Sequence, residues 1–172
     1  NYIQNNISGN CIESNEFYID AGNGNDSNPG TEAAPMLTIG KVLSMVKENG
    51  STTYIYVSDG LYSPSTTGEV FPLNIPDNVH LIGSTRENTI IDIEANTEKQ
   101  ARGFIVQEVA NVKIANFTIM GGSAEDAGCQ GGGAILLTNN NSDVYDENGE
   151  NAPYAESMAI LENLHITENH AY

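Results

Sequence analysis

Two short residue patterns recur along the chain at spacings that constrain its fold. Residues 78–81 (NVHL) resemble residues 111–114 (NVKI), 33 positions later, and residues 114–119 (IANFTI) resemble residues 161–166 (LENLHI), 47 positions later. Repeats of roughly 20 to 50 residues are typical of solenoids, in which each coil rests on its neighbours. The unequal spacing predicts coils that keep their strands and vary their turns.

Beyond residue 70 the apolar residues no longer recur with the period of a helix. They form short runs between Asn- and Gly-rich turns instead. Such runs, without intervening helices, indicate an all-β solenoid or sandwich, and the internal repeats decide for the solenoid. In one coil we expect Phe117 and Ile119 inside with Thr118 outside, and the same alternation at 164–166. Asn116 and Asn163 precede these buried pairs, and are expected either to stack as an Asn ladder or to act only as turn residues.

The chain divides into three parts. Residues 1–16 form a polar leader, residues 17–70 a cap region and residues 71–172 the coils. Within the cap region a helix is predicted over about 38–48, with Thr38 as N-cap and an apolar stripe that covers one end of the stack. We expect the coils to continue beyond residue 172 or to meet another copy head to tail, because an open coil end exposes unpaired backbone groups.

The charge of the chain excludes several partners. Six Lys and Arg against 23 Asp and Glu give a net charge of -17, which repels nucleic acid and anionic lipid. No apolar run approaches the ~20 residues of a transmembrane helix, so membrane insertion is not expected. Cys11 and Cys129 make no disulfide framework, and whether the two are bridged stays open.

Two acidic loops offer oxygen ligands of the kind that Ca²⁺ prefers. The candidate metal ligands are Asp20 and Asp26 in one loop, and Asp143, Asp146, Asn148 and Glu150 in the other. A structural Ca²⁺ held in a turn and a plainly solvated acidic loop are both compatible with these patterns. The three histidines lack ligand spacing, so a histidine metal site is not expected.

Three tyrosines are candidates for carbohydrate binding. Tyr54 and Tyr56 share one face of a predicted strand, and Tyr62 follows shortly after. Their rings either stack on sugars at the surface or pack under the cap helix.

The first half of the chain resembles known proteins. The motifs FYID (17–20), GNDSNPGT (24–31), APMLTI (34–39) and YVSDGLY (56–62) are similar to the opening of bacterial right-handed parallel β-helix proteins. These include a β-helix domain family of unknown function and the family 9 polysaccharide lyases. The resemblance covers about residues 17–95, and implies a right-handed, pectate-lyase-like β-helix.

The second half resembles another branch of that superfamily. Residues 132–135 (GGAI) and 166–169 (ITEN) are similar to the GGAI and FxxN repeats of adhesin-type β-helices, with Ile166 in place of the usual Phe. The resemblance implies an extracellular or cell-surface protein, most often bacterial.

Catalytic residues are not identifiable. A lyase base in this fold is usually Lys or Arg, and Lys113 alone among six such residues lies directly in a coil strand. Carboxylate pairs such as Asp92 and Glu94 are too frequent in so acidic a chain to indicate a glycosidase.

We therefore expect a non-catalytic extracellular β-helix module for attachment, carbohydrate binding or surface structure. Its expected partner is extracellular polysaccharide or a cell surface. The alternative is the N-terminal part of a polysaccharide lyase or glycoside hydrolase.

Overall fold

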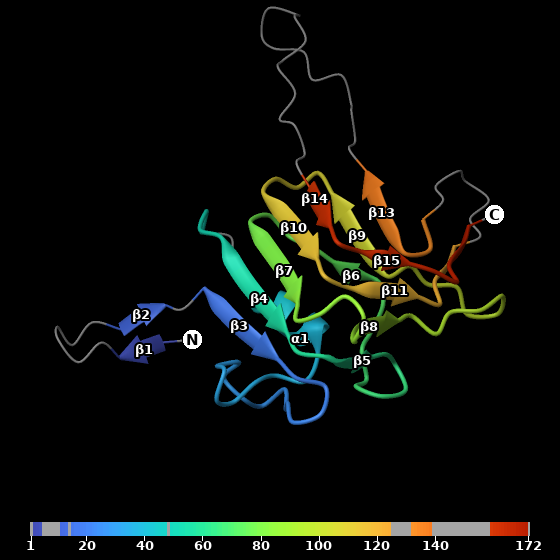
Figure 1. The fold of residues 1–172 in the computed structure, drawn as a ribbon. Helices are drawn as coiled ribbons and strands as arrows, with labels where there is room; N and C mark the ends of the chain where they lie inside the picture. Colours follow the sequence, from blue (N-terminus) through green and yellow to red (C-terminus); the bar gives the residue numbers. More distant parts are fainter. Residues whose placement is uncertain are drawn as a thin grey trace, which may run out of the picture.

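The strands of the chain form three parallel sheets, which the backbone visits in turn (Figure 1). This computed structural model describes residues 2–4, 11–13, 15–47, 49–124, 132–138 and 159–171. The first sheet contains β3 (Glu16–Ile19), β4 (Thr53–Val57), β7 (Val79–Gly83), β10 (Val112–Ala115) and β14 (Ala159–Glu162), side by side in that order. The second contains β5 (Gly60–Tyr62), β8 (Thr89–Asp92), β11 (Thr118–Met120) and β15 (His165–Ile166). The third contains β6 (Leu73–Asn74), β9 (Phe104–Gln107) and β13 (Ile135–Thr138).

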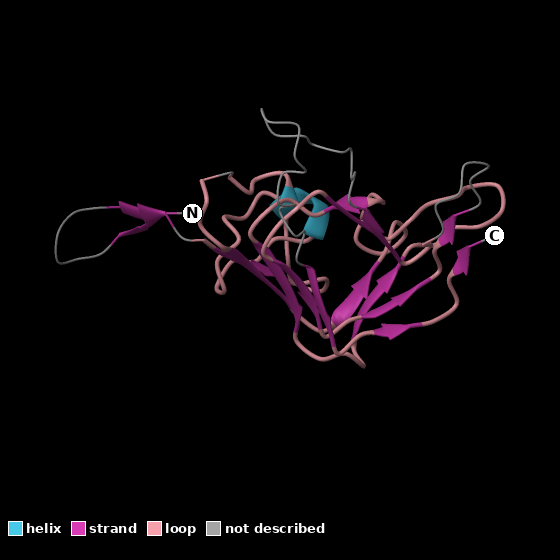
Figure 2. Cartoon of the chain, turned by 90° about the horizontal axis from the view of Figure 1, so that it is seen from above, coloured by secondary structure: helices cyan, strands magenta, loops and turns pink. Residues whose placement is uncertain are grey.

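Two short strand pairs complete the described structure. β12 (Ser123–Ala124) pairs in parallel with β16 (His170–Ala171), and β1 (Tyr2–Gln4) pairs antiparallel with β2 (Cys11–Glu13). Viewed from above, walls of strands meet at an angle, and the short helix α1 (Ile39–Leu43) lies between their open ends (Figure 2). An all-β fold of parallel sheets with almost no helix is consistent with the predicted β-helix. No described helix has the length and apolar character to cross a membrane.

Rows of stacked apolar side chains form the core. In the first sheet the inward positions of successive strands lie opposite one another in register, and Phe17, Ile55, Leu81 and Ile114 are all buried. Strand alternation places every second residue of each strand in such a row. The row ends at Leu161 on β14, which is 38 % exposed.

The predicted repeats pair as the sequence indicates. His80 lies opposite Lys113, and Ile114 lies opposite Leu161, so the offsets of 33 and 47 are the sequence separations of paired parallel strands. Phe117 and Ile119 are buried as predicted. Ile166 is 51 % exposed instead of buried, because no described strand follows it in the second sheet.

The predicted Asn ladder is confirmed. Asn163 Nδ2 donates to Asn116 Oδ1 at 2.9 Å, and Asn116 Nδ2 donates to the carbonyl oxygen of Gly83 at 3.1 Å. Both residues have left-handed backbones, with φ of 49° and 64°. Asn tolerates this region better than most residues, which explains its recurrence at the same bend.

A second ladder stands at the other end of the same strands. Asn111 Nδ2 donates to Asn78 Oδ1 and to Thr52 Oγ1, both at 3.0 Å. Asn78 and Asn111 also have positive φ, of 59° and 54°. Matching Asn residues thus hold the bends on both sides of the first sheet.

Helix α1 begins as predicted and ends earlier. Thr38 is its N-cap, and Thr38 Oγ1 accepts a hydrogen bond from the Lys41 amide at 3.2 Å. The helix stops at Leu43 because Ser44 Oγ donates back to the Lys41 carbonyl at 2.7 Å, and the chain then continues in tighter turns.

A buried carboxylate that sequence reasoning missed fixes the start of α1. Glu69 is 3 % exposed, and its two oxygens accept hydrogen bonds from the amides of Ile39 and Gly40, each at 2.8 Å. These are amides of the first helical turn, which have no partner within the helix. Glu69 therefore ties α1, which lies beside β6, to the segment that leads into that strand.

The outer edge of β3 is covered by a loop and not by the helix. The Tyr18 amide donates to the Gly30 carbonyl, and the Met36 amide donates to the Tyr18 carbonyl, both at 2.9 Å. The cap predicted from the helix alone is thus shared between α1 and residues 30–36.

Replacing Asn116 by Ala is expected to lower the free energy of unfolding by about 2–3 kcal/mol. Ala adopts the left-handed backbone conformation at a higher free-energy cost than Asn, and it has no side-chain amide to form the hydrogen bonds of the ladder. Asn116→Gly is the control, because Gly adopts the left-handed backbone conformation without a steric cost and loses only the side-chain hydrogen bonds of Asn116. It should therefore lower the free energy of unfolding less than Asn116→Ala does. Denaturant unfolding measures both. Equal stability of wild type and Asn116→Ala would show that the ladder contributes nothing.

Candidate functional site

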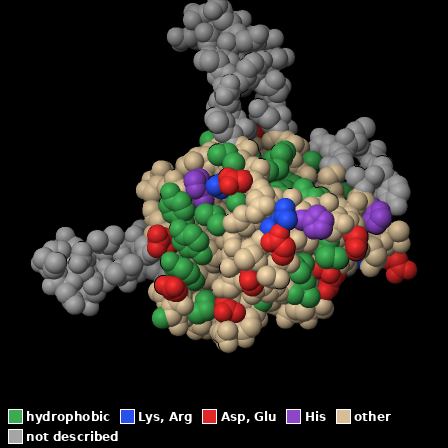
Figure 3. Space-filling model, in the orientation of Figure 1, with side chains coloured by type: hydrophobic (Ala, Val, Ile, Leu, Met, Phe, Trp, Pro, Cys, Tyr) green, Lys and Arg blue, Asp and Glu red, His purple; other side chains and the backbone are tan. Residues whose placement is uncertain are grey.

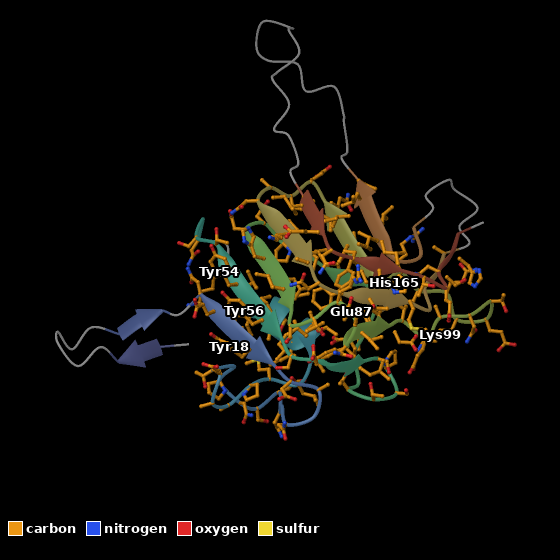
Figure 4. All side chains as sticks on the ribbon, viewed as in Figure 1. Tyr18, Tyr54, Tyr56, Glu87, Lys99 and His165 are labelled. Atoms are coloured by element: carbon orange, nitrogen blue, oxygen red, sulfur yellow. The ribbon has the colours of Figure 1, made fainter. Side chains whose placement is uncertain are left out.

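Three tyrosines lie together on the outer face of the first sheet (Figure 4). Tyr18 comes from β3, and Tyr54 and Tyr56 come from β4; we call these three residues the tyrosine patch. They point outward because their strand neighbours, Phe17 and Ile55, occupy the buried row. In the register of the sheet, Tyr18 lies directly opposite Tyr56.

The rings of the tyrosine patch contact one another. The ring centroids of Tyr18 and Tyr56 are 5.3 Å apart, and those of Tyr54 and Tyr56 are 6.4 Å apart with only 11° between their planes. The imidazole of His80 on β7 meets Tyr54 edge-on, with centroids 5.2 Å apart. Mutual contacts of this kind limit ring motion, and leave an ordered aromatic surface.

A shallow depression of about 380 Å³ adjoins the patch. It is lined by Tyr18, Tyr56, Val57, Ser58, Ile82, Gly83 and Ser84. Tyr54 is 36 % exposed, and Tyr18 and Tyr56 are half-buried. Figure 3 shows hydrophobic side chains as a band over this part of the sheet, with acidic side chains along its border. The surface thus combines an apolar floor with hydroxyl groups.

Carboxylates give the patch a negative environment. Glu16 lies opposite Tyr54 in the register of the sheet. Partial burial, followed by the charges of Glu16 and Glu32, raises the pKa of Tyr18 above its ordinary value. Partial burial and Glu16 likewise raise the pKa of Tyr56. The phenols of Tyr18 and Tyr56 therefore stay neutral donors and acceptors across the physiological range.

Tyr62 does not belong to this surface: of the two alternatives for its ring, contact with sugars and packing in the interior, the structure shows packing. It lies inward on β5 opposite Ile91, and its side chain is fully buried. Its hydroxyl donates to the Ser58 carbonyl at 2.9 Å and accepts from the Ala21 amide at 3.2 Å. Burial raises the pKa of Tyr62, and the side chain acts as a structural tie between the first two coils.

Asp20 and Asp26 accept hydrogen bonds within their own loop. Asp20 Oδ1 accepts from the amides of Gly22 and Asn23, at 2.8 and 3.0 Å. Partial burial alone would raise the pKa of Asp20, but the effect of these hydrogen bonds is larger, so the pKa of Asp20 is lowered. Asp26 Oδ1 accepts from the Thr38 amide and Oδ2 from the Thr38 hydroxyl, at 2.9 and 2.8 Å. Both carboxylates therefore order the loop that leads into α1.

Calcium binding stays a prediction. Within the described ranges no three or more His, Cys, Asp or Glu side chains gather as a metal site would require. The other candidate ligands, Asp143, Asp146, Asn148 and Glu150, lie outside the described residues, as does Cys129.

The residues considered for catalysis are engaged in other contacts. Lys113 points outward from β10 as predicted, and its Nζ lies 2.8 Å from Glu162 Oε2. Asp92 Oδ1 accepts from the Glu94 amide, while Glu94 accepts from the hydroxyl of Ser63 at 2.7 Å. Hydrogen bonds from Ser65 and Ser63 lower the pKa of Glu94, whereas a general acid needs a raised one. Neither arrangement favours the enzyme hypothesis.

Sequence reasoning found Tyr54 and Tyr56 but missed Tyr18. The available signal was the alternation in residues 16–19, where Phe17 and Ile19 are the inward pair and Tyr18 must therefore point outward. What the alternation does not supply is the pairing of β3 with β4, which brings Tyr18 and Tyr56 into contact.

Comparison with known families gives one match. A family described as "Protein of unknown function (DUF1565)" matches residues 22–148. This range contains Tyr54 and Tyr56 but begins after Tyr18. Neither the curated proteins nor the solved structures contain a match to the chain.

Tyr62→Phe is expected to lower the free energy of unfolding by about 1–2 kcal/mol, because the substitution leaves the Ala21 amide and the Ser58 carbonyl without their buried partner. Tyr56→Phe is the matched control and should change stability little, since its ring stays half-exposed. Thermal or urea unfolding checks the pair. Equal losses for both variants would contradict the structural role assigned to Tyr62.

The contributions of two glutamates to the free energy of unfolding are expected to change with pH in opposite directions. Glu69 is buried, and Glu94 is held by hydrogen bonds. Burial, opposed by amide bonds from Gly40 and Ile39, raises the pKa of Glu69 above 4.5. The stability that Glu69 confers relative to Gln is therefore complete below pH 4.5, and is lost as pH rises through the raised pKa. For Glu94, whose pKa is lowered, the contribution is present above pH 4.5 and is lost as pH falls through the lowered pKa.

The measurement is the unfolding free energy of wild type, Glu69→Gln and Glu94→Gln across that pH range. The difference from wild type should change in opposite directions for the two variants. Parallel pH profiles would show that the environment of Glu69 is not the buried one described.

Proposed function

The chain belongs to the DUF1565 family of proteins of unknown function, and we propose that it is a non-catalytic, extracellular β-helix module that binds carbohydrate through the tyrosine patch. The observation that supports this proposal is the exposure of three contacting tyrosines beside a depression lined with hydroxyl groups. Sugars present apolar C–H faces and many hydroxyls. An aromatic surface with polar groups at its border suits both.

The sheet supports the patch as a rigid platform. Tyr18 and Tyr56 stand on neighbouring strands that are paired over four residues, and the inward side chains between them are buried. A side chain held on a strand of a packed sheet loses less freedom on binding than one on a mobile loop. This arrangement favours retention of a chain-like ligand over a broad, shallow surface.

We take the coils to wind right-handed, as in the β-helix proteins that the sequence resembles. Successive strands of the first sheet are parallel, and the chain between β4 and β7 passes through the other two sheets. Connections of this type are right-handed in about 98 % of cases. A right-handed coil is thus the expected form of the module.

Replacing Tyr54 and Tyr56 together by Ala is expected to weaken binding to the best glycan on an array roughly tenfold, because each lost ring contact contributes about 0.5–1.5 kcal/mol. Leu61→Ala is the matched control, since Leu61 is 39 % exposed but lies on the second sheet. Binding affinity is then measured by calorimetry on variants whose thermal unfolding is cooperative. If the double variant and the control retain the glycan equally, the patch is not the binding surface.

A further inference from the structure

We propose that His80 belongs to the carbohydrate site and supplies an oriented hydrogen-bond acceptor. The site then selects glycans with a free hydroxyl at one position over glycans that are deoxygenated or substituted there. This inference rests on the proposed function, and adds the chemical feature of the ligand that the site recognises. It follows from the hydrogen bonds that hold the imidazole of His80.

His80 stands next to the tyrosine patch on the same face of the first sheet. In the register of the sheet it lies opposite Tyr54, and its ring meets that of Tyr54 edge-on, with centroids 5.2 Å apart and 86° between the planes. Its strand neighbours Val79 and Leu81 are buried, so the imidazole points outward as the tyrosines do. The imidazole therefore borders the position of a sugar stacked on Tyr54.

The Asn ladder at this end of the sheet fixes which nitrogen of His80 carries the proton. Asn111 Nδ2 donates both of its hydrogens, to Asn78 Oδ1 and to Thr52 Oγ1, each at 3.0 Å. These bonds orient the amide, and leave Asn111 Oδ1 as the acceptor that lies 3.2 Å from His80 Nε2. Because two acceptors do not bond each other, Nε2 of the neutral imidazole carries the proton and Nδ1 does not.

The unprotonated Nδ1 is open to a ligand. Within the part of the chain that the structure describes, His80 forms a hydrogen bond with Asn111 alone, and its Nδ1 is not among the buried polar side-chain atoms that lack a partner. Nδ1 therefore faces solvent, while Asn111 and the ring of Tyr54 hold the imidazole in place. An acceptor that is ordered in advance loses little side-chain entropy when a donor binds.

A sugar hydroxyl is the donor that suits this acceptor. Stacking on an aromatic ring tolerates many sugars, whereas one fixed acceptor favours a hydroxyl at one position of the stacked sugar. Loss of that hydroxyl, or its conversion to an ether or ester, removes the donor. The acceptor is then left without a partner in the complex, and the modified glycan binds more weakly.

The tautomer of His80 is tested without any ligand. Long-range proton–nitrogen NMR spectra of protein labelled with ¹⁵N-histidine distinguish the two tautomers, and His80→Phe identifies the resonances of His80. The spectra are recorded at about pH 8, above the range in which histidine changes charge. We expect the proton on Nε2. A proton on Nδ1 overturns the proposal.

Binding is tested as a cycle of protein variant and ligand analogue. The probe is the oligosaccharide that binds best on an array of glucose, mannose, xylose and galactose oligomers, together with its monodeoxy analogues, and affinities are measured by calorimetry. In wild type, one deoxy analogue should bind about three- to tenfold more weakly than the parent. His80→Phe keeps an aromatic edge beside Tyr54 and should weaken binding of the parent by a similar factor, with no further loss for that analogue.

His165→Phe is the matched control. His165 is exposed on β15 of the second sheet, away from the patch in Figure 4, so its substitution should change neither affinity. Affinities are compared for variants whose thermal unfolding is cooperative. Should His80→Phe not fold, titration of wild type decides, because the His80 Nδ1 resonance should shift with the parent oligosaccharide and stay in place with the deoxy analogue.

The outcomes separate this inference from the function on which it rests. An equal penalty for the deoxy analogue in wild type and His80→Phe, or an Nδ1 resonance that does not respond to the parent oligosaccharide, overturns the role of His80 while the binding function stands. If none of the oligomers on the array binds, both proposals fall.

Discussion

The in-register pairing of each parallel strand with the next is the interaction on which the rest of the structure depends. Each strand of the first sheet places its inward side chain against the matching residue of the strand before it, as Ile55, Leu81 and Ile114 do. Because side chains alternate along a strand, a slip of one residue would turn every buried side chain outward. The apolar row and the Asn ladders at both bends fix the same register independently.

That register creates the candidate site. Once the inward row is fixed, the outward positions of β3 and β4 form two lines, one with Glu16 and Tyr54 and the other with Tyr18 and Tyr56. Residues that are far apart in the sequence thereby become neighbours at strand spacing. The aromatic contacts and the nearby carboxylate are consequences of the same pairing that builds the core, so the site is as rigid as the sheet beneath it.

The parts of the structure that could be predicted from the sequence are those built from segments that recur along the chain. The offsets between matching segments gave the strand pairs of β7, β10 and β14, and the recurring Asn before the buried pair gave the ladder. Thr38 could be recognised as an N-cap from local chemistry alone. The first coil has no repeated segment, so the neighbour of β3, and with it Tyr18 as part of the site, could not be predicted. For Tyr62 the choice between the surface and the packed interior stayed open, because β5 is too short to show its alternation. The role of Glu69 depends on a contact across 30 residues.

The most direct test of the account follows the tyrosine rings themselves. NMR spectra of a sample labelled in its eight tyrosines, recorded during titration with the glycan that binds best on an array, report which rings meet the ligand. The account predicts that the ring resonances of Tyr18, Tyr54 and Tyr56 move together and saturate at one affinity, while those of buried Tyr62 stay in place. Saturable binding that leaves all three patch tyrosines unshifted would contradict it.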